Sequence, residues 1–207
     1  MDNKLILPRA YISWSQLNCW ETNPVRYRKE YFENGPRLES KYLSFGKKVH
    51  ELIENDKHKD ILPDLVVYPV RELEIRCDVL GVPVLAYIDS YDPIENVFRD
   101  TKTGTVPWDK AKVIKHGQLP FYAVAIKCHT GKAPEYCHLD WLQSKEGGGD
   151  KPSVDFWRTG ESDLMLTGYM KSFQRDFSEI ELEKMENRIV KVAQEISEAY
   201  QLFLKEI

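Results

Sequence analysis

The spacing of hydrophobic positions changes along the chain. Leu43, Val49, Leu52 and Ile53 have helical spacing, whereas hydrophobic and polar residues alternate between Leu65 and Lys102. The alternating segments are 66–68, 73–77, 82–88 and 97–99, and Gly81, Asp92–Pro93 and Glu95–Asn96 mark the turns. The pattern predicts a helix followed by an antiparallel meander of about three or four strands. Gly46, one turn before His50, predicts a close approach of this helix to a neighbour.

Further elements are predicted on both sides of the meander. Ser13 and Ser15 precede a short N-terminal helix that should end near Asn23–Pro24. A second helix is expected over 118–128, with Pro120 in its first turn. The segment 136–142 has a strand pattern, and a strand reached through a helix is expected to run parallel to its neighbour. Gly147 to Gly149 predict a flexible loop or a hairpin tip.

The C-terminal segment predicts a long helix. Ser178 and Glu181 form a capping-box pattern, and Phe177 with Leu182 can form the matching hydrophobic staple. Hydrophobic residues follow at alternating spacings of four and three: Met185, Ile189, Val192, Ile196, Ala199 and Phe203. The pattern favours a helix that packs on the sheet. A dimeric coiled coil is the alternative, although the repeat is only about three heptads long.

Length and composition indicate one domain. The chain has 207 residues, of which 42% are hydrophobic and 30% charged. We expect a single α/β domain over 1–207, with an N-terminal helical region at about 11–60, a mixed but mainly antiparallel sheet flanked by helices, and the C-terminal helix at about 178–205. No stretch resembles a signal peptide or a membrane span, and the four cysteines form no CxxC pair. A reducing, cytoplasmic location is therefore expected.

The charge of the chain is unevenly distributed. The formal net charge of −4 argues against binding a polyanion through a uniformly basic surface. Residues 101–132, however, contain six lysines and one acid, Asp109. Bases also alternate with aromatic residues between Arg26 and Phe32. Both segments are typical of a local phosphate-binding groove or, equally, of an ordinary solvated surface.

Two acids and a lysine stand at the ends of predicted neighbouring strands. Asp89 follows the hydrophobic run 86–88, and Asp100 and Lys102, two residues apart, point to the same face of the next strand. Neighbouring carboxylates repel one another unless a cation lies between them, and oxygen ligands suit Mg²⁺ or Mn²⁺. A lysine beside such a site can orient a water and offset phosphate charge. Each residue alone has an ordinary structural explanation, such as an acid in a turn.

The order of these residues resembles that of a known nuclease superfamily. The matching residues are Gly46 and His50, then Gly81 and Ile88–Asp89, then 100–104 (Asp-Thr-Lys-Thr-Gly), then 118–123 (Gln-Leu-Pro-Phe-Tyr-Ala). The opening 13–17 and the Asn23–Pro24 pair also match. Over roughly 11–142 the chain therefore resembles the PD-(D/E)XK nucleases, in the RecB-type branch that includes CRISPR adaptation nucleases and phage exonucleases. The resemblance implies a restriction-endonuclease-like core.

The resemblance also implies roles for individual residues. His50, Asp89 and Asp100 would be metal ligands together with the backbone carbonyl of Thr101, and Lys102 would be the catalytic lysine. Gln118 and Tyr122, four apart on one helix face, match the family's Gln-x-x-x-Tyr motif, which lies near the active site. From its residue type alone, Tyr122 would be a core residue. Because imidazole is a softer ligand than carboxylate, Mn²⁺ is a plausible alternative to Mg²⁺.

The chain departs from some relatives in its cysteines. These relatives hold an iron–sulfur cluster through one early cysteine and three near the C-terminus, whereas nothing after Cys137 could complete the set begun by Cys19. We therefore expect no iron–sulfur cluster. The pairs Cys128–His129 and Cys137–His138 lack the usual spacing of zinc ligands. No GxxxxGK[ST] motif is present, so a helicase or recombination partner, if one takes part, would be another chain.

The implied activity is metal-dependent hydrolysis of DNA phosphodiester bonds, with a 5′ phosphate left on the product. By family analogy we expect an exonuclease that acts on DNA ends or single strands in recombination, repair, phage DNA processing or CRISPR adaptation, in a prokaryotic or phage-infected cell. The residues expected to contact DNA phosphates without reading sequence are Arg26, Arg28, Lys29, Lys110, Lys112 and Lys115. Trp14, Trp20 or Trp108 would stack on bases or belong to the core.

Two alternatives remain at this point. The first is a non-catalytic DNA-binding or assembly subunit that retains the nuclease fold. The second is an unrelated α/β protein in which the acids at the strand ends are structural.

Overall fold

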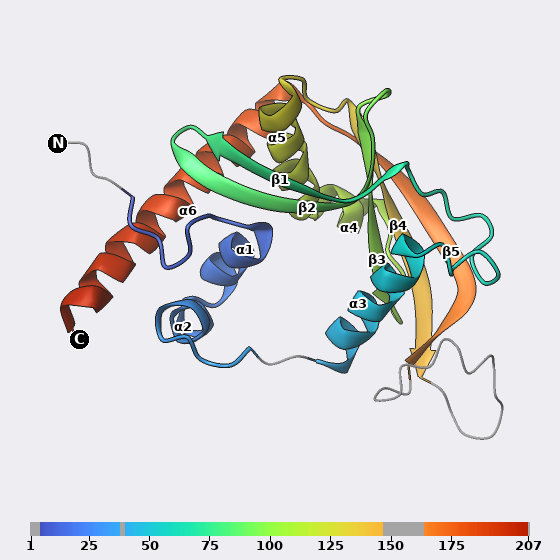
Figure 1. Ribbon diagram of the computed structural model, residues 1–207, viewed down its shortest axis with the longest axis horizontal. Coiled ribbons are helices and arrows are strands. Elements are labelled where there is room, and N and C mark those ends of the chain that lie inside the picture. Colours follow the sequence, from blue (N-terminus) through green and yellow to red (C-terminus); the bar gives the residue numbers. More distant parts are fainter. Residues whose placement is uncertain (1–4, 38–39, 147–163, 207) are drawn as a thin grey trace.

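A five-stranded sheet forms the centre of the molecule (Figure 1). The computed structural model describes residues 5–37, 40–146 and 164–206, so the predicted glycine loop at 147–149 lies outside the described residues. The strands are β1 (Val70–Val79), β2 (Val82–Asp92), β3 (Val97–Gly104), β4 (Tyr136–Glu146) and β5 (Leu164–Asp176), in the spatial order β1-β2-β3-β4-β5. Neighbouring strands are antiparallel except β3 and β4, which are parallel. The predicted mixed, mainly antiparallel sheet is confirmed.

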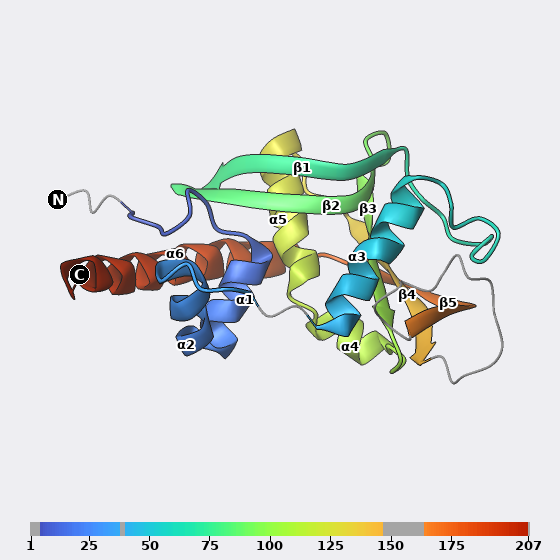
Figure 2. The same ribbon diagram turned by 60° about the horizontal axis from the view of Figure 1, so that its bottom comes forward.

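Helices cover both faces of the sheet. In the described parts of the chain these are α1 (Trp14–Thr22), α2 (Pro24–Tyr27), the π-helical segment η1 (Arg28–Phe32), α3 (Lys41–Glu54), α4 (Lys110–Lys115), α5 (Gln118–Thr130) and α6 (Glu179–Glu206). Helix α5 packs on β1, β2 and α6, whereas α3 packs on β3 and β5. Figure 2 shows α3 alongside β3, with α1 and α2 grouped beside α6. No helix among the described residues is both long and apolar enough to cross a membrane.

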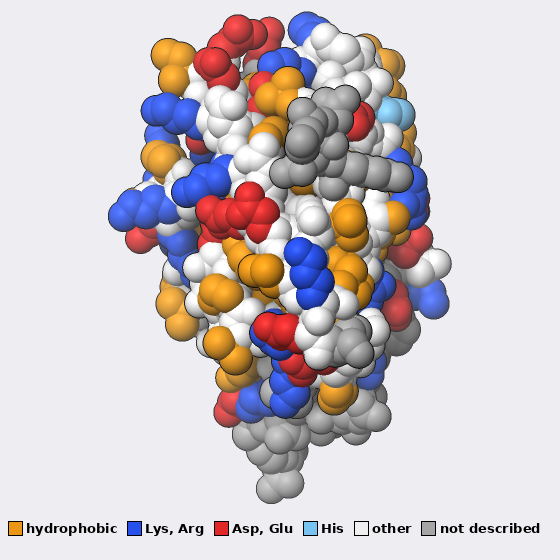
Figure 3. Space-filling model, turned by 90° about the vertical axis from the view of Figure 1, so that its left-hand side faces the viewer, with side chains coloured by type: hydrophobic (Ala, Val, Ile, Leu, Met, Phe, Trp, Pro, Cys, Tyr) orange, Lys and Arg blue, Asp and Glu red, His pale blue; other side chains and the backbone are white. Residues whose placement is uncertain are grey.

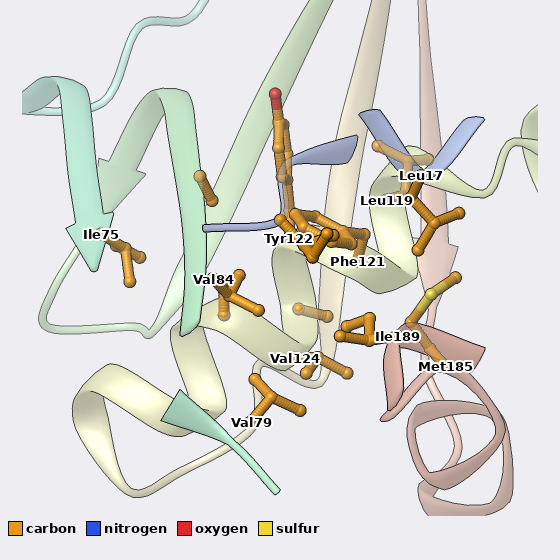
Figure 4. Close-up of a cluster of buried hydrophobic side chains, with 14 of the residues drawn as sticks. Leu17, Ile75, Val79, Val84, Leu119, Phe121, Tyr122, Val124, Met185 and Ile189 are labelled. Carbon is orange, nitrogen blue, oxygen red and sulfur yellow. The ribbon is translucent and has the colours of Figure 1, made fainter. Parts of the chain in front are cut away.

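The connection that makes β3 and β4 parallel also places α5 in the core. Eight consecutive residues of α5, from Leu119 to Ile126, are buried. Pro120 lies in the first turn, as predicted, where a helix needs no N–H from it. Figure 4 shows side chains of α5 between the β1–β2 hairpin and the hydrophobic stripe of α6. The first turn of α5 is thereby held in a fixed position beside the sheet.

The predicted long C-terminal helix is confirmed. Ser178 Oγ accepts a hydrogen bond from the backbone N–H of Glu181, which is one half of the predicted capping box. The Glu181 carboxylate instead binds the guanidinium of Arg175. The hydrophobic stripe of α6 joins the core of its own chain, since Met185, Ile189 and Ile196 are buried there. The stripe is thus buried against the core of its own chain, which includes α5, rather than against a helix from a second copy.

Two parts of the predicted strand pattern were wrong. Residues 66–68 are not a strand, because Leu65 and Val67 pack into a second hydrophobic cluster with α3 and β5 while Val66 is exposed. Strand β5 had not been predicted. Leu164, Met165 and Leu166 are buried in succession, and mostly exposed positions follow, so this strand lacks the alternation of period two.

Candidate metal centre

Strands β2 and β3 separate just beyond Ser90 and Arg99, the last pair in their ladder. The next residues are Asp89 and Asp100. Beyond this point both polar backbone groups of Thr101 bind side chains. Its N–H donates to Asp89 Oδ2 at 2.6 Å, and its carbonyl oxygen lies 3.1 Å from His50 Nε2. The separation of the strands therefore opens a site in which an acid and a histidine meet the β3 backbone.

Helix α3 carries His50 to this opening. The position of a Cβ on Gly46 would lie 3.4 Å from Thr103 Oγ1, so the lack of a side chain lets α3 approach β3 closely. The predicted close contact at Gly46 is confirmed. One turn later, His50 Nδ1 lies 3.6 Å from Asp89 Oδ1.

Glu72 also lies in this site, although no sequence pattern pointed to it. It falls opposite Asp89 between the pairs Arg71–Ser90 and Leu73–Ile88, and neither residue has a ladder partner. Its φ of 46° lies in the left-handed region, which an L residue occupies at some cost and which is frequent at functional sites. The Oε1 atom of Glu72 lies 3.9 Å from His50 Nδ1.

His50, Glu72 and Asp89 form a group that can hold a metal ion. Each offers a ligand atom, and these atoms all lie within 4.8 Å of one another. A cavity of about 480 Å³ between α3 and β3 is lined by His50, Glu72 and Lys102. A larger cavity of about 1130 Å³ lies between residues 5–10, the β1–β2 turn and α6, away from these residues. Two of the three metal-binding side chains, those of His50 and Glu72, therefore line the smaller of these two cavities.

Asp100 and Lys102 share a face of β3, as predicted. Lys102 Nζ donates to Asp100 Oδ1 at 3.0 Å. The Asp100 side chain is completely buried, and its Oδ2 has no hydrogen-bond partner among the described residues. A buried carboxylate oxygen without a partner is energetically unfavourable, and a divalent cation would satisfy it. The donor set of the site therefore fits a metal such as Mg²⁺ or Mn²⁺.

The charges in the site shift the pKa values of its side chains. Burial lowers the pKa of His50, but the charge of Asp89 and the side-chain interaction with Glu72 outweigh burial and raise it to about 9. Burial raises the pKa of Asp89 to about 6, because the opposing effect of His50 is only partial and Asp100 adds repulsion. Burial lowers the pKa of Lys102, yet Asp100 and Asp89 bring it above its ordinary value. At neutral pH, His50 and Lys102 are therefore cations that offset the carboxylates.

Gln118 and Tyr122 lie next to this cluster on α5. Gln118 Nε2 donates to the Tyr122 hydroxyl, and Gln118 Oε1 lies 3.2 Å from Nε2 of His116. The Tyr122 ring is in the core, while Figure 4 shows its hydroxyl directed away from the hydrophobic cluster. Burial raises the pKa of Tyr122 well above its ordinary value, and the charges of Asp100 and Asp89 raise it further. The ring thus has the core role expected from its residue type, and the hydroxyl stays protonated close to the carboxylates.

The basic residues expected at DNA lie in two separate places. Arg26, Arg28 and Lys29 are on α2 and η1, where Arg26 binds Glu30 and Arg28 binds Glu33 and Glu206. The side of the molecule with the two termini, seen in Figure 3, carries intermixed acidic, basic and hydrophobic side chains. Lys110, Lys112 and Lys115 are exposed on α4, which follows β3 and precedes α5. Only the α4 group lies between the two elements that carry Lys102 and Gln118.

The tryptophans and cysteines considered from the sequence lie in or beside the core, or stand apart from any group of metal-binding side chains. Trp14, Trp20 and Trp108 are partly buried against the main core. Trp20 Nε1 donates to Glu195, and Lys112 Nζ lies 4.2 Å from the centre of the Trp108 ring. Cys128 is exposed and Cys137 is buried, and within residues 5–37, 40–146 and 164–206 neither joins a group of three metal-binding side chains.

Comparison with known proteins identifies the fold. No protein-family model matches the chain, and no curated protein matches it either. Among solved structures, a phage-related exonuclease from Haemophilus somnus 129PT superposes with a TM-score of 0.53 at 14% identity, over 87% of this chain and 80% of that one. The LHK-Exo complex with dAMP gives a TM-score of 0.53 at 12% identity, over 96% and 94%.

A second structure of LHK-Exo, described as an alkaline exonuclease from Laribacter hongkongensis, gives a TM-score of 0.50 at 12% identity, over 98% of this chain and 94% of that one. The chain therefore has the nuclease fold of the phage-related and alkaline exonucleases.

Proposed function

We propose that this protein is a divalent-metal-dependent deoxyribonuclease of the RecB-type PD-(D/E)XK branch, and that it acts as an exonuclease on DNA ends or single strands. The observation that carries the proposal is the cluster of His50, Glu72, Asp89, Asp100 and Lys102 at the point where β2 and β3 separate. Its location in a fold shared with exonucleases supports the same activity. The proposed setting is recombination, repair, phage DNA processing or CRISPR adaptation.

The proposed metal ligands are His50, Asp89, Asp100 and the carbonyl oxygen of Thr101, with Glu72 as an additional ligand. Two observations support this assignment: Oδ2 of Asp100 has no hydrogen-bond partner in the part of the chain that the structure describes, and His50, Glu72 and Asp89 converge. Mg²⁺ or Mn²⁺ bound there would supply Lewis-acid polarisation of the phosphate and a more acidic water. His50 must release its proton to become a ligand, which links metal binding to pH.

The residues around the ligands would position the substrate and stabilise charge. Lys102 retains its proton beside Asp100, so its ammonium group can donate to an oxygen of the scissile phosphate as negative charge develops there. Asp100 holds the Lys102 side chain in place through their hydrogen bond. In-line attack by a water would expel the 3′ oxygen and leave a 5′ phosphate.

Gln118 and Tyr122 would form the wall of the site opposite α3. Their mutual hydrogen bond and the contact of Gln118 with His116 hold both side chains in place. The Tyr122 hydroxyl can then donate to the substrate or to a carboxylate. Lys110, Lys112 and Lys115 on α4 are the proposed contacts to backbone phosphates next to the site. Arg26, Arg28 and Lys29 would contact DNA only further along the strand.

The proposal is tested with a panel of DNA substrates. Purified protein is incubated with linear and circular DNA, each single- and double-stranded, in Mg²⁺, in Mn²⁺ and in EDTA. We expect linear DNA to be shortened from its ends in the presence of either metal, and all substrates to survive in EDTA. If the protein binds DNA but leaves every substrate intact, it is a non-catalytic subunit with the nuclease fold. Cleavage of circular DNA, which has no ends, would show that the protein is an endonuclease rather than an exonuclease.

A further inference from the structure

A second concave site lies on the far side of the first turn of α5. This pocket has a volume of about 210 Å³ and is enclosed by the end of α4, the start of α5, β5 and the first part of α6. It has room for a phosphate group and several waters, because one water occupies about 30 Å³. We call it the basic pocket because four of the residues that line it are Lys115, Arg175, Lys184 and Arg188.

The basic pocket has a surplus of positive charge. Glu181 pairs with Arg175, and Glu21 pairs with Arg188 through a hydrogen bond of 2.9 Å to Nε. The side chains of Lys115 and Lys184 are exposed and have no ion pair among the described residues. Because Glu181 and Glu21 offset Arg175 and Arg188, the surplus of positive charge comes from Lys115 and Lys184, and a bound anion would offset it.

Arg175 lines this pocket, and part of its guanidinium group has no hydrogen-bond partner among the described residues. The residue is only 5% exposed. Its Nη2 donates to the carbonyl oxygen of Ile114 at 3.0 Å and to Glu181. Its Nε and Nη1 are buried and have no hydrogen-bond partner in the described part of the chain. Buried guanidinium donors without acceptors are unfavourable, whereas an oxyanion can accept from several of them at once.

We propose that the basic pocket binds a phosphate group through Arg175, Lys115 and Lys184. The ligand class is a tetrahedral phosphate oxyanion, supplied by a backbone phosphate of a DNA strand or by free inorganic phosphate. The pocket is separate from the metal centre, because Gly117 and Pro120 line it whereas Gln118 and Tyr122 belong to the metal side of α5.

The DNA source rests on the proposed nuclease function, whereas phosphate binding does not. A strand held in the basic pocket would be anchored across the first turn of α5 from the proposed point of cleavage. Lys115, at the end of α4, would then be the α4 lysine that belongs to this anchor.

The first test measures thermal unfolding of the whole protein in EDTA while inorganic phosphate replaces chloride at constant ionic strength. We expect phosphate to raise the Tm of the wild type in a saturable way. The double variant Lys115→Gln/Lys184→Gln should bind phosphate at least about tenfold more weakly, because charge-assisted contacts of this kind each exceed one tenfold step in affinity. Both lysines are exposed, so the variant should fold.

The matched control is Lys57→Gln/Lys132→Gln, which removes the same charge from two exposed lysines outside the basic pocket. It should respond to phosphate like the wild type. Arg175→Lys keeps the charge but loses the planar fork, and should also weaken phosphate binding. The proposal is overturned if phosphate does not raise the wild-type Tm, or if the pocket variant and the control respond alike.

The second test identifies the source of the phosphate. A labelled single-stranded oligonucleotide with a 5′ hydroxyl is titrated in EDTA with each variant, and binding is followed by fluorescence anisotropy. Weaker binding by the pocket variant than by the control, together with competition by inorganic phosphate, assigns the pocket to a backbone phosphate. Equal binding by the two variants, with phosphate binding still lost in the pocket variant, assigns it to free phosphate. Neither measurement depends on cleavage, so failure of the nuclease proposal would be seen separately.

Discussion

Asp89 Oδ2 accepts a hydrogen bond from the backbone N–H of Thr101 at 2.6 Å. The other carboxylate oxygen of Asp89 faces His50. One side chain therefore fixes the start of the Asp100–Lys102 segment and contributes to the proposed metal centre. The structural and the metal-binding contributions of Asp89 can be separated, because an amide can still accept the backbone hydrogen bond without carrying charge.

We expect Asp89→Asn to keep the fold and Asp89→Ala to weaken it. The alanine variant leaves the Thr101 N–H without its partner, at a cost of about 1–3 kcal/mol in the free energy of unfolding. The asparagine variant retains an acceptor and removes a buried charge. Both variants should bind Mn²⁺ at least about tenfold more weakly. Denaturant unfolding and calorimetric titration with Mn²⁺ measure the two effects, and equal stability of the two variants would contradict the structural part.

Glu72 is tested as an additional metal ligand by Glu72→Gln. We expect affinity for Mn²⁺ to fall by about 10–100-fold, as for loss of a group that supports a metal site. Glu74→Gln, two residues further along β1, is the matched control, because Glu74 binds Arg76 and Tyr87 instead. If the two variants bind Mn²⁺ equally well, Glu72 is not a ligand.

The site predicts that the metal-free protein loses stability as pH rises above neutrality. The pKa of His50 is about 9 in the folded protein against an ordinary value of 6.5. Because the folded value is the higher one, the stabilisation is complete below about pH 6.5 and is lost as pH rises through 9. A shift of this size corresponds to at most about 3 kcal/mol. Unfolding in EDTA between pH 6.5 and 9.5 measures this loss.

The control for this pH dependence is a second histidine. His50→Gln should flatten the decline in stability above pH 6.5, whereas His129→Gln, at an exposed position on α5, should leave it unchanged. A decline of the same size in His50→Gln and the wild type would mean that His50 is not its source.

The parts of the fold that follow local spacing could be predicted from the sequence. The β1–β3 meander and α6 have clear periods of two or of about 3.6, and Pro120 of α5 and Ser178 before α6 mark helix starts. Strand β5 could not be found, because its burial depends on what α3 and the loop before β1 place against it. The strand predicted at 66–68 was wrong because the alternating residues there pack into the second hydrophobic cluster from a loop, without pairing in the sheet.

The candidate site divides in a similar way. Asp100 and Lys102 could be paired from the sequence because residues two apart share a face of a strand. Glu72 could not be found, since its place in the site comes from a left-handed backbone conformation at a break in the β1–β2 ladder. The basic pocket could not be found either, because it combines Lys115 of α4 with cations of β5 and α6, which follow much later in the sequence.

Tyr122→Phe separates the hydroxyl from the ring. The ring remains in the core, so the free energy of unfolding should change by less than about 1.5 kcal/mol. We expect the cleavage rate to fall by about 10–100-fold if the hydroxyl positions a reacting group. Tyr136→Phe is the matched control on β4, where the ring contacts His138 rather than the metal centre. If Tyr122→Phe cleaves DNA at the wild-type rate, the hydroxyl has no role in cleavage and the residue serves only in core packing.

The most direct test of the account compares Asp100→Asn and Lys102→Met with the wild type on linear DNA in Mn²⁺, after circular dichroism has shown that all are folded. Asp64→Asn, at an exposed position outside the site, is the control. We expect the wild type and the control to degrade the DNA, and both site variants to be slower by about 100- to 1000-fold, as for loss of a group that stabilises charge in the transition state. Degradation at the wild-type rate by either site variant would contradict the assignment of this metal centre as the nuclease active site.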